Sequence, residues 1–366
     1  MLLHRLPLWV WFVFGALSVA AVLTIHLGWH HWNPTAYLQV GATTPARIPI
    51  ERDFPELALE SSLGHDGKYS YLLARQPAFW RADDLTLTGL QDPGYRYARP
   101  LYPLLGGLGG QLSPWGTLVG LLVVQLFAGG LYSVALARFA RWHRLPSAFV
   151  LLNLANPGIS SSACLLTSDL LAIALALTAW QLVERGRLRY GIALFALALL
   201  AKEYYVLLPL ALAAAFAGQR RWRDALAIAG LPLVPILAWK LALTAAVGLG
   251  QGQSNFDRPF AGILQTYSEW PVENIPFGLF GLVIVLGTLD AVMLRRLPAR
   301  LRWACLVWGL LGACTSRLVW ADPHDLLRAI APAWWLTSWA GFAASRSRWQ
   351  PAEPVARALG STGDRL

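Results

Sequence analysis

Long apolar runs separated by short clusters of arginine are the feature of this sequence that most constrains its fold. The first run extends from Pro7 to about Gly28, and the last from about 327 to 344. Because a membrane-spanning helix needs about 20 predominantly apolar residues, these runs predict roughly ten crossings, some of them irregular. The 56% hydrophobic content is also more than a soluble core could hide. We therefore predict an all-α polytopic integral membrane protein.

The arginine clusters predict which side of the membrane each loop faces, because cytoplasmic loops accumulate Lys and Arg. In the short loops, fifteen arginines fall on one side, and one lysine and three arginines on the other. The fifteen are Arg138, Arg141, Arg144, Arg185, Arg187, Arg189, Arg220, Arg221, Arg223, Arg295, Arg296, Arg300, Arg302, Arg346 and Arg348. We infer a multi-pass protein of the plasma (inner) membrane with both termini in the cytoplasm. The net charge of +10 is then a matter of topology and does not indicate a nucleic-acid partner.

The runs are consistent with one transmembrane domain over residues 1–345, which includes a large first extracytoplasmic loop at 29–100. The stretch Leu101–Leu112 is too short and glycine-rich to span and is expected at the interface. The tail, 346–366, is expected to be cytoplasmic and disordered. The spans are expected at 7–28, 114–137, two within 147–183 divided by a turn near Asp169, 190–217 split by Lys202-Glu203, 224–247, 277–294, 303–320 and 327–344.

The charged pair Lys202-Glu203 leaves two interpretations of the run 190–217. The twelve residues before Lys202 give only about 18 Å of helix, which is short of a hydrocarbon core of about 30 Å. One long helix would move the cluster around Arg220 to the outer side, whereas a hairpin of two short helices keeps it inside. The charge pattern favours the hairpin.

Ionisable residues gather on the outer side of this topology. Such groups are costly at membrane depth unless they are paired or line a polar cavity, so they are functional candidates, with a structural ion pair as the alternative for Lys202-Glu203. The group comprises Asp66, Asp169, Lys202, Glu203, Asp257, Arg258, Asp322, Asp325 and Arg328.

Two motifs in the first outer loop carry a resemblance to a known family. Gly64-His65-Asp66-Gly67-Lys68-Tyr69 is followed by Tyr95-Arg96-Tyr97-Ala98-Arg99-Pro100-Leu101-Tyr102-Pro103-Leu104-Leu105. The chain thereby resembles GT-C glycosyltransferases. It is similar to bacterial membrane proteins of cell-surface glycopolymer formation and, more remotely, to the second GPI mannosyltransferase, with which it shares an aspartate-glycine-x-tyrosine element and a later tyrosine-proline-leucine-leucine element. Asn156-Pro157 with Ser168-Asp169, Ala201-Lys202-Glu203, and Arg328 before the last span fit the same outline, although Thr167-Ser168-Asp169 replaces a tyrosine-x-glutamate-like element.

The resemblance implies a GT-C-like fold and an enzyme that moves a sugar from a polyprenyl-phosphate carrier to a glycan or lipid acceptor on the outer side, with inversion. The sugar, mannose-like or another hexosyl or pentosyl group, is not indicated. In that chemistry Asp66 is the expected catalytic base for the acceptor hydroxyl. Lys202 and Arg328 are expected to stabilise the departing lipid phosphate; Arg96 or Arg99 could do the same, with a solvated loop charge as the alternative for these two.

Three further residues are expected to bind substrate. Tyr69 belongs to the aspartate-glycine-x-tyrosine element, and Asp169 and Glu203 could orient the cations, hold acceptor hydroxyls or bind a divalent metal. Beyond the lipid-linked donor, no cofactor is indicated. The alternative functions are a polytopic transporter or lipid flippase, and a non-catalytic scaffold of surface-polymer assembly; a transporter usually places its charges near the midplane and in repeated halves.

Overall fold

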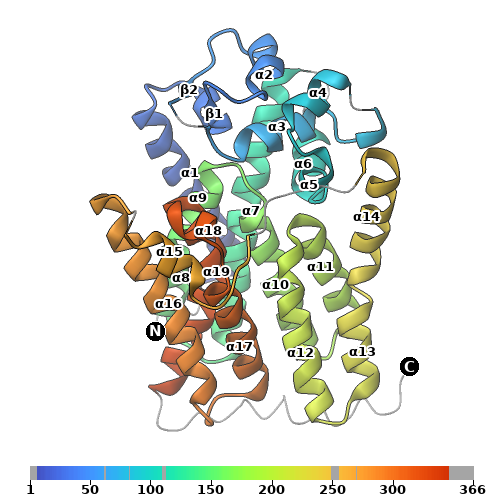
Figure 1. The fold of residues 1–366 in the computed structure, drawn as a ribbon. Helices are drawn as coiled ribbons and strands as arrows, with labels where there is room; N and C mark the ends of the chain where they lie inside the picture. The colour runs from blue at the N-terminus through green and yellow to red at the C-terminus, as the bar shows by residue number, and fades with distance from the viewer. Residues whose placement is uncertain are drawn as a thin grey trace.

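The computed structural model is mostly helical, at 76%, as the apolar runs predict. It describes residues 6–345 except 62, 82, 109–112, 249–254 and 269, so the predicted disordered tail at 346–366 lies outside the described residues. Within that part, the only sheet is a parallel pair of two-residue strands, β1 (Val40–Gly41) and β2 (Leu59–Glu60). Figure 1 shows a helix bundle with a smaller head over one end.

Four helical segments of the described chain are long and apolar enough to cross a membrane. They are α1 (Leu8–Trp29), α7 (Pro114–Trp142), α13 and α14 together (Trp222–Gly230 and Leu233–Val247), and α16 (Ile275–Met293) with the short η5 (Val272–Asn274) before it. Trp9 and Trp29 near the ends of α1 are 68% and 77% exposed. Their twenty-residue separation spans about 30 Å, the thickness of a hydrocarbon core, and tryptophan favours both membrane interfaces. The protein is therefore suited to a membrane.

The remaining helices of the bundle pack among these four. The most deeply buried is α10 (Asp169–Glu184), whose nearly continuous apolar sequence suits a helix surrounded on all sides. The others are α8 (Ser147–Leu154), α9 (Pro157–Cys164), α11 (Leu188–Ala201), η4 (Glu203–Val206), α12 (Leu207–Gly218), α15 (Ala261–Thr266), α17 (Ala299–Ala313), α18 (Arg317–Ala321) and α19 (Pro323–Ala344).

The head is built from the polar segment between α1 and α7. Its elements are η2 (Pro34–Leu38), β1, α2 (Arg47–Asp53), β2, α3 (Gly67–Arg75), η3 (Phe79–Arg81), α4 (Asp84–Gly89), α5 (Pro93–Arg96) and α6 (Leu101–Leu108). The stretch expected at the interface begins with α6, which packs closely on α7: a Cβ on Gly120 would lie 2.1 Å from the carbonyl oxygen of Gly106. This contact joins the head to the bundle.

The break at Lys202 agrees with the hairpin interpretation and makes the single long helix wrong. Lys202 has extended backbone, with φ −156° and ψ 114°, and ends α11 at Ala201. Glu203 bonds Arg99 of the head, and the indole of Trp239 on α14 donates to the carbonyl oxygen of Tyr97 at 2.7 Å. The chain therefore leaves the head along α12 and returns along α13 and α14, with their turn at the far end of the bundle (Figure 1).

Two predicted spans are corrected by the structure. The span 303–320 is wrong, because α17 ends at Ala313: the carbonyl oxygen of Cys314 accepts from the amide of Asp257 at 2.8 Å, and the amide of Ser316 donates to Asn255. These bonds replace the helical ones. The first half of 147–183 is two eight-residue helices, α8 and α9, because Asn156 precedes a proline and caps the amide of Gly158.

Candidate active site

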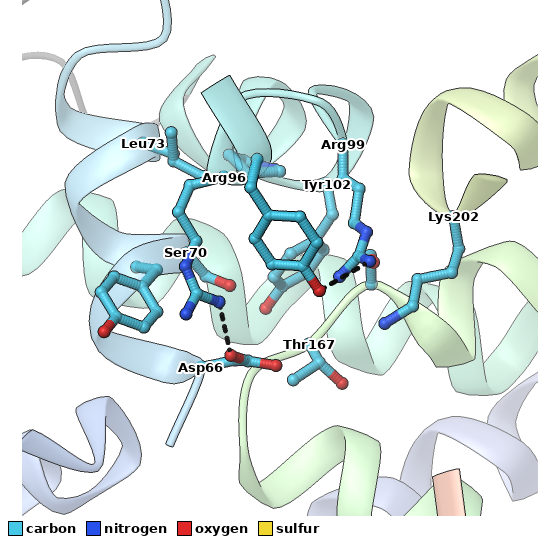
Figure 2. Close-up of a pocket in the computed structure, with 12 residues that line it drawn as sticks. Asp66, Ser70, Leu73, Arg96, Arg99, Tyr102, Thr167 and Lys202 are labelled. Carbon is cyan, nitrogen blue, oxygen red and sulfur yellow. Dashed lines mark hydrogen bonds and ion pairs between the residues drawn. The ribbon is translucent and has the colours of Figure 1, made fainter. Parts of the chain in front are cut away.

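A pocket that opens to solvent lies where the head meets the bundle. Figure 2 shows Asp66 and Arg96 on one side of it, and Arg99 and Lys202 on the other. Asp66 occupies the N-cap position of α3, Arg96 ends α5, Arg99 lies between α5 and α6, and Lys202 lies in the break between α11 and α12. The lining is completed by Tyr69, Ser70, Leu73, Tyr95, Tyr102, Pro103, Thr167 and Ser168. The site thus depends on segments far apart in the chain.

The carboxylate of Asp66 lies between two guanidinium groups. Arg96 donates from Nη1 to Oδ1 at 2.9 Å, and Arg328 donates from Nη1 and Nη2 to Oδ2 at 3.1 and 3.2 Å. Burial opposes ionisation, but Arg328 and then Arg96 hold the pKa of Asp66 well below its usual range. The side chain is still 30% exposed and faces the pocket, so a ligand could reach it.

The short loop before Asp66 is held by a buried lysine. The ammonium of Lys68 donates to the carbonyl oxygens of Leu63 and His65, at 2.9 and 2.8 Å. Burial lowers the pKa of Lys68 to about 8. These two bonds fix the loop that leads into α3 just before Asp66, and so help to orient the Asp66 carboxylate.

Asp169 at the start of α10 anchors Lys202. The Lys202 ammonium lies 3.3 Å from Asp169 Oδ1, and the two side chains are 9% and 2% exposed. Thr167 donates to Oδ2 at 3.0 Å, and the hydroxyl of Tyr204 donates to Oδ1. Arg328 also approaches, with Nη1 3.9 Å from Oδ2. Asp169 is therefore surrounded by donors and holds Lys202 at the pocket wall.

Arg99 is fixed by a bidentate pair with Glu203, through Nε to Oε2 and Nη2 to Oε1, both at 2.8 Å. Nη2 also donates to the Tyr95 hydroxyl at 3.0 Å. Parallel paired bonds of this kind set orientation as well as energy. The pair joins the head to the break after α11, and so ties the two walls of the pocket together.

Aromatic rings surround Arg96. Its guanidinium carbon lies 3.7 Å from the centroid of the Tyr69 ring and 5.1 Å from that of Tyr95. The Tyr69 hydroxyl donates to Gln91 Oε1 at 2.7 Å, which fixes the ring. Arg96 Nε is buried and has no hydrogen-bond partner among the described residues. The arginine is thus held in place mainly by Asp66 and by stacking.

The eight residues selected from the sequence form one ionic cluster. Asp66, Tyr69, Arg96, Arg99 and Lys202 line the pocket. The other three stand behind the lining, each ion-paired to a lining residue: Arg328 to Asp66, Glu203 to Arg99, and Asp169 to Lys202.

Four contributors to the cluster were not selected from the sequence as site residues. They are Tyr95, Thr167, Tyr204 and Asp325; Asp325, which bonds Arg328, was counted among the outer ionisable residues but was given no role. Tyr95 and Thr167 lie inside the quoted motifs, so the motifs could have indicated them as site residues. Tyr204, which follows Lys202-Glu203, belongs to no quoted motif. In the described ranges, no three His, Cys, Asp or Glu side chains group closely enough to hold a metal ion.

Comparisons with known proteins give no match: no family model, no curated protein and no solved structure is significantly similar to this chain. The function must therefore be argued from the chemistry of the pocket.

Proposed function

We propose that this protein is a membrane glycosyltransferase similar to the GT-C type. It would transfer a sugar from a polyprenyl-phosphate carrier to a hydroxyl of a cell-surface glycan or lipid on the extracytoplasmic side. The observation that carries the proposal is the Asp66 carboxylate held between Arg96 and Arg328 at a pocket also lined by Arg99 and Lys202. A base beside several cations is what proton removal from an acceptor and departure of a phosphate both require.

The reaction can be written with this chain's groups. The acceptor hydroxyl gives its proton to Asp66, and its oxygen bonds to the anomeric carbon while the bond from that carbon to the carrier phosphate breaks. The electron pair of that bond leaves with the phosphate, and attack from the opposite face inverts the anomeric centre. Arg96, Arg328 and Lys202 are the cations closest to Asp66 and Asp169, and stabilise the charge on the departing phosphate.

The lowered pKa of Asp66 makes it a weak base while both arginines bind it. A donor phosphate that enters the pocket competes for the same guanidinium groups. When Arg96 and Arg328 donate some of their hydrogen bonds to the phosphate, they stabilise the ionised form of Asp66 less, and the pKa of Asp66 rises. Asp66 is therefore an effective base when the sugar donor is bound and a weak base when it is not.

We also propose the membrane placement that this chemistry needs. The head-side pocket faces the extracytoplasmic space, the arginine-rich end faces the cytoplasm, and both termini lie there. The pair α8 and α9, taken as one crossing, and the helices α10, α11, α12, α17 and α19 cross together with the four long segments, which gives ten crossings. The pocket then lies at the outer interface, where a lipid phosphate can reach it while its tail stays in the bilayer. The loop 29–100 belongs to the outer side and 346–366 forms a cytoplasmic tail.

The test uses purified full-length protein with polyprenyl-phosphate sugars and a candidate acceptor. Asp66→Asn should lower the transfer rate by about 10²- to 10⁴-fold, the usual contribution of a positioned base. Lys202→Ala should also lower it. The matched control is Asp83→Asn, which makes the same change at the helix cap of α4, where Asn caps as well as Asp. Unchanged transfer in Asp66→Asn would remove the proposed base, and lipid movement without any glycosyl product would favour a flippase.

A further inference from the structure

Three arginines crowd together at the end of the bundle opposite the head. On the parallel helices α7 and α10, the side-chain amide of Gln181 donates to the carbonyl oxygen of Ala135 at 2.8 Å. One turn further along each helix come Arg138 and Arg185, and Arg187 follows in the turn. Burial and the nearby Arg138 and Arg187 lower the pKa of Arg185 more than the neighbouring Glu184 raises it.

Arg185 shares its nearest anion with two other side chains. That acid, Glu184, is already taken: His143 Nε2 lies 2.9 Å from one carboxylate oxygen, and Arg300 Nε 2.6 Å from the other. No ion pair of Arg138, Arg185 or Arg187 occurs among residues 6–345 as far as they are described. Arg185 instead packs over the ring of Trp142 at 5.1 Å, and its buried Nε has no acceptor there. Arg138 and Arg187 are exposed, so an anionic ligand can reach this group of like charges.

The depth of this cluster points to a lipid. Arg141, one residue before Trp142, donates to the carbonyl oxygen of Leu6, so the end of α7 is level with the start of α1. The exposed ring of Trp9 marks that level as a membrane interface. We propose that Arg138, Arg185 and Arg187, with Trp142 beside them, bind the phosphodiester headgroup of an anionic membrane lipid. Basic pockets between membrane helices bind lipid phosphates in this way.

The first experiment measures lipid retention by native mass spectrometry of the full chain purified in detergent. Phosphatidylglycerol should be retained in preference to phosphatidylcholine, whose headgroup carries no net charge. Arg138→Gln and Arg185→Gln should each reduce its retention about fivefold. Arg223→Gln, an exposed arginine at the same end, should leave it unchanged. Equal retention of both lipids, or full retention by the variant that carries both Arg138→Gln and Arg185→Gln, would overturn the proposal.

The second experiment separates a binding site from a structural role, and a lipid from free phosphate. Without anionic lipid, Arg138→Gln should raise the Tm, because it relieves repulsion with Arg185. Adding phosphatidylglycerol should then raise the Tm of the native chain by more than that of the variant. A variant that lowers the Tm in both conditions, or inorganic phosphate that stabilises the native chain as much as the lipid does, would contradict the assignment.

Discussion

The electrostatic grip of Arg96 on Asp66 leads to a pH prediction. The ionised carboxylate is the active form of the proposed base, and because its pKa is lowered, kcat/KM should fall only at pH values well below the usual range of an aspartate. Arg96→Gln removes one favourable charge and should raise this pKa, which moves the acid limb of the kcat/KM profile up by about one pH unit. The measurement is the pH dependence of sugar transfer at low substrate concentration.

If Arg96→Gln lowers the maximum of the kcat/KM profile but does not shift its acid limb, Arg96 acts on substrate binding alone. Arg96→Lys is the informative companion, because it keeps a charge near Asp66 but loses the stacking on Tyr69. Its acid limb should stay close to that of the native protein. Asp83→Asn changes a capping carboxylate of α4 and should alter neither the acid limb nor the maximum of the kcat/KM profile.

The sequence predicted eight members of the cluster but not their pairing. A charged residue inside an apolar run is energetically unfavourable in a membrane unless it has a function or a partner. Lys202 and Arg328 could be selected for that reason. The partner of each charge depends on how the helices pack, and pairs such as Arg99 with Glu203 lie 104 residues apart. The contact of Tyr204 with Asp169 follows from that packing, so no local pattern reveals it, whereas Asp325 and Arg328 are three residues apart on α19, a spacing that brings side chains together on one helix.

The break between α11 and α12 is held by the pair of Lys202 with Asp169. Removing one partner of a buried pair leaves an uncompensated charge, so Lys202→Met should cost about 3 kcal/mol in the free energy of unfolding. Adding Asp169→Leu removes the stranded carboxylate and should recover most of that loss. Thermal unfolding of the single and double variants in detergent measures both effects.

The double-mutant cycle has a simple control in Lys240→Met. Lys240 lies on α14 and forms no ion pair in the described ranges, so its loss should change the Tm little. If the double variant is no more stable than Lys202→Met, the pair does not hold the break, and the hydrogen bonds of Tyr204 and Thr167 must do so.

The crossing of α1 and α7 depends on glycine. A Cβ on Gly15 would lie 2.3 Å from the carbonyl oxygen of Gly129, a backbone atom that cannot move aside. Gly15→Val should therefore push the two helices apart and lower the Tm strongly, since small residues permit such close packing in membrane proteins. Gly28→Ala on the same helix is the control, because its Cβ would meet only Trp32 at 3.9 Å. Equal stability of both variants would show that the crossing is not tight.

Helix positions were more predictable than helix ends. Apolar length placed α1 and α16 within about two residues of the expected spans. It failed where tertiary bonds compete with the helix: α17 stops at Ala313 because Cys314 pairs with Asp257. Apolar length also placed the span 224–247, which α13 and α14 form together; it gave no sign of the break at Leu231 and Pro232, where proline lacks an amide to continue the helix.

The two ends of the molecule differ in charge composition, and this difference supports the proposed orientation. Near the head, cations alternate with acids, and each acid of the pocket cluster bonds a cation. At the far end, arginines exceed acids, and Glu184 serves both His143 and Arg300. An unbalanced positive end facing the cytoplasm and a balanced polar cluster facing outward are what the distribution of arginine along the sequence predicts.

That orientation predicts which positions an impermeant reagent reaches. In a variant whose three cysteines are replaced by alanine, single cysteines would be placed at Glu56 in the head, at Asp257 near the end of α17, and at Arg187 in the far turn, all exposed positions. A membrane-impermeant maleimide added to intact cells should label positions 56 and 257 but not 187, which should react only after the membrane is opened. Because Asp66 belongs to the head and Lys202 bonds Asp169 beside it, head labelling from outside would place the whole pocket there. Labelling of position 187 in intact cells, with positions 56 and 257 protected, would invert the topology and leave an extracytoplasmic transferase without its site.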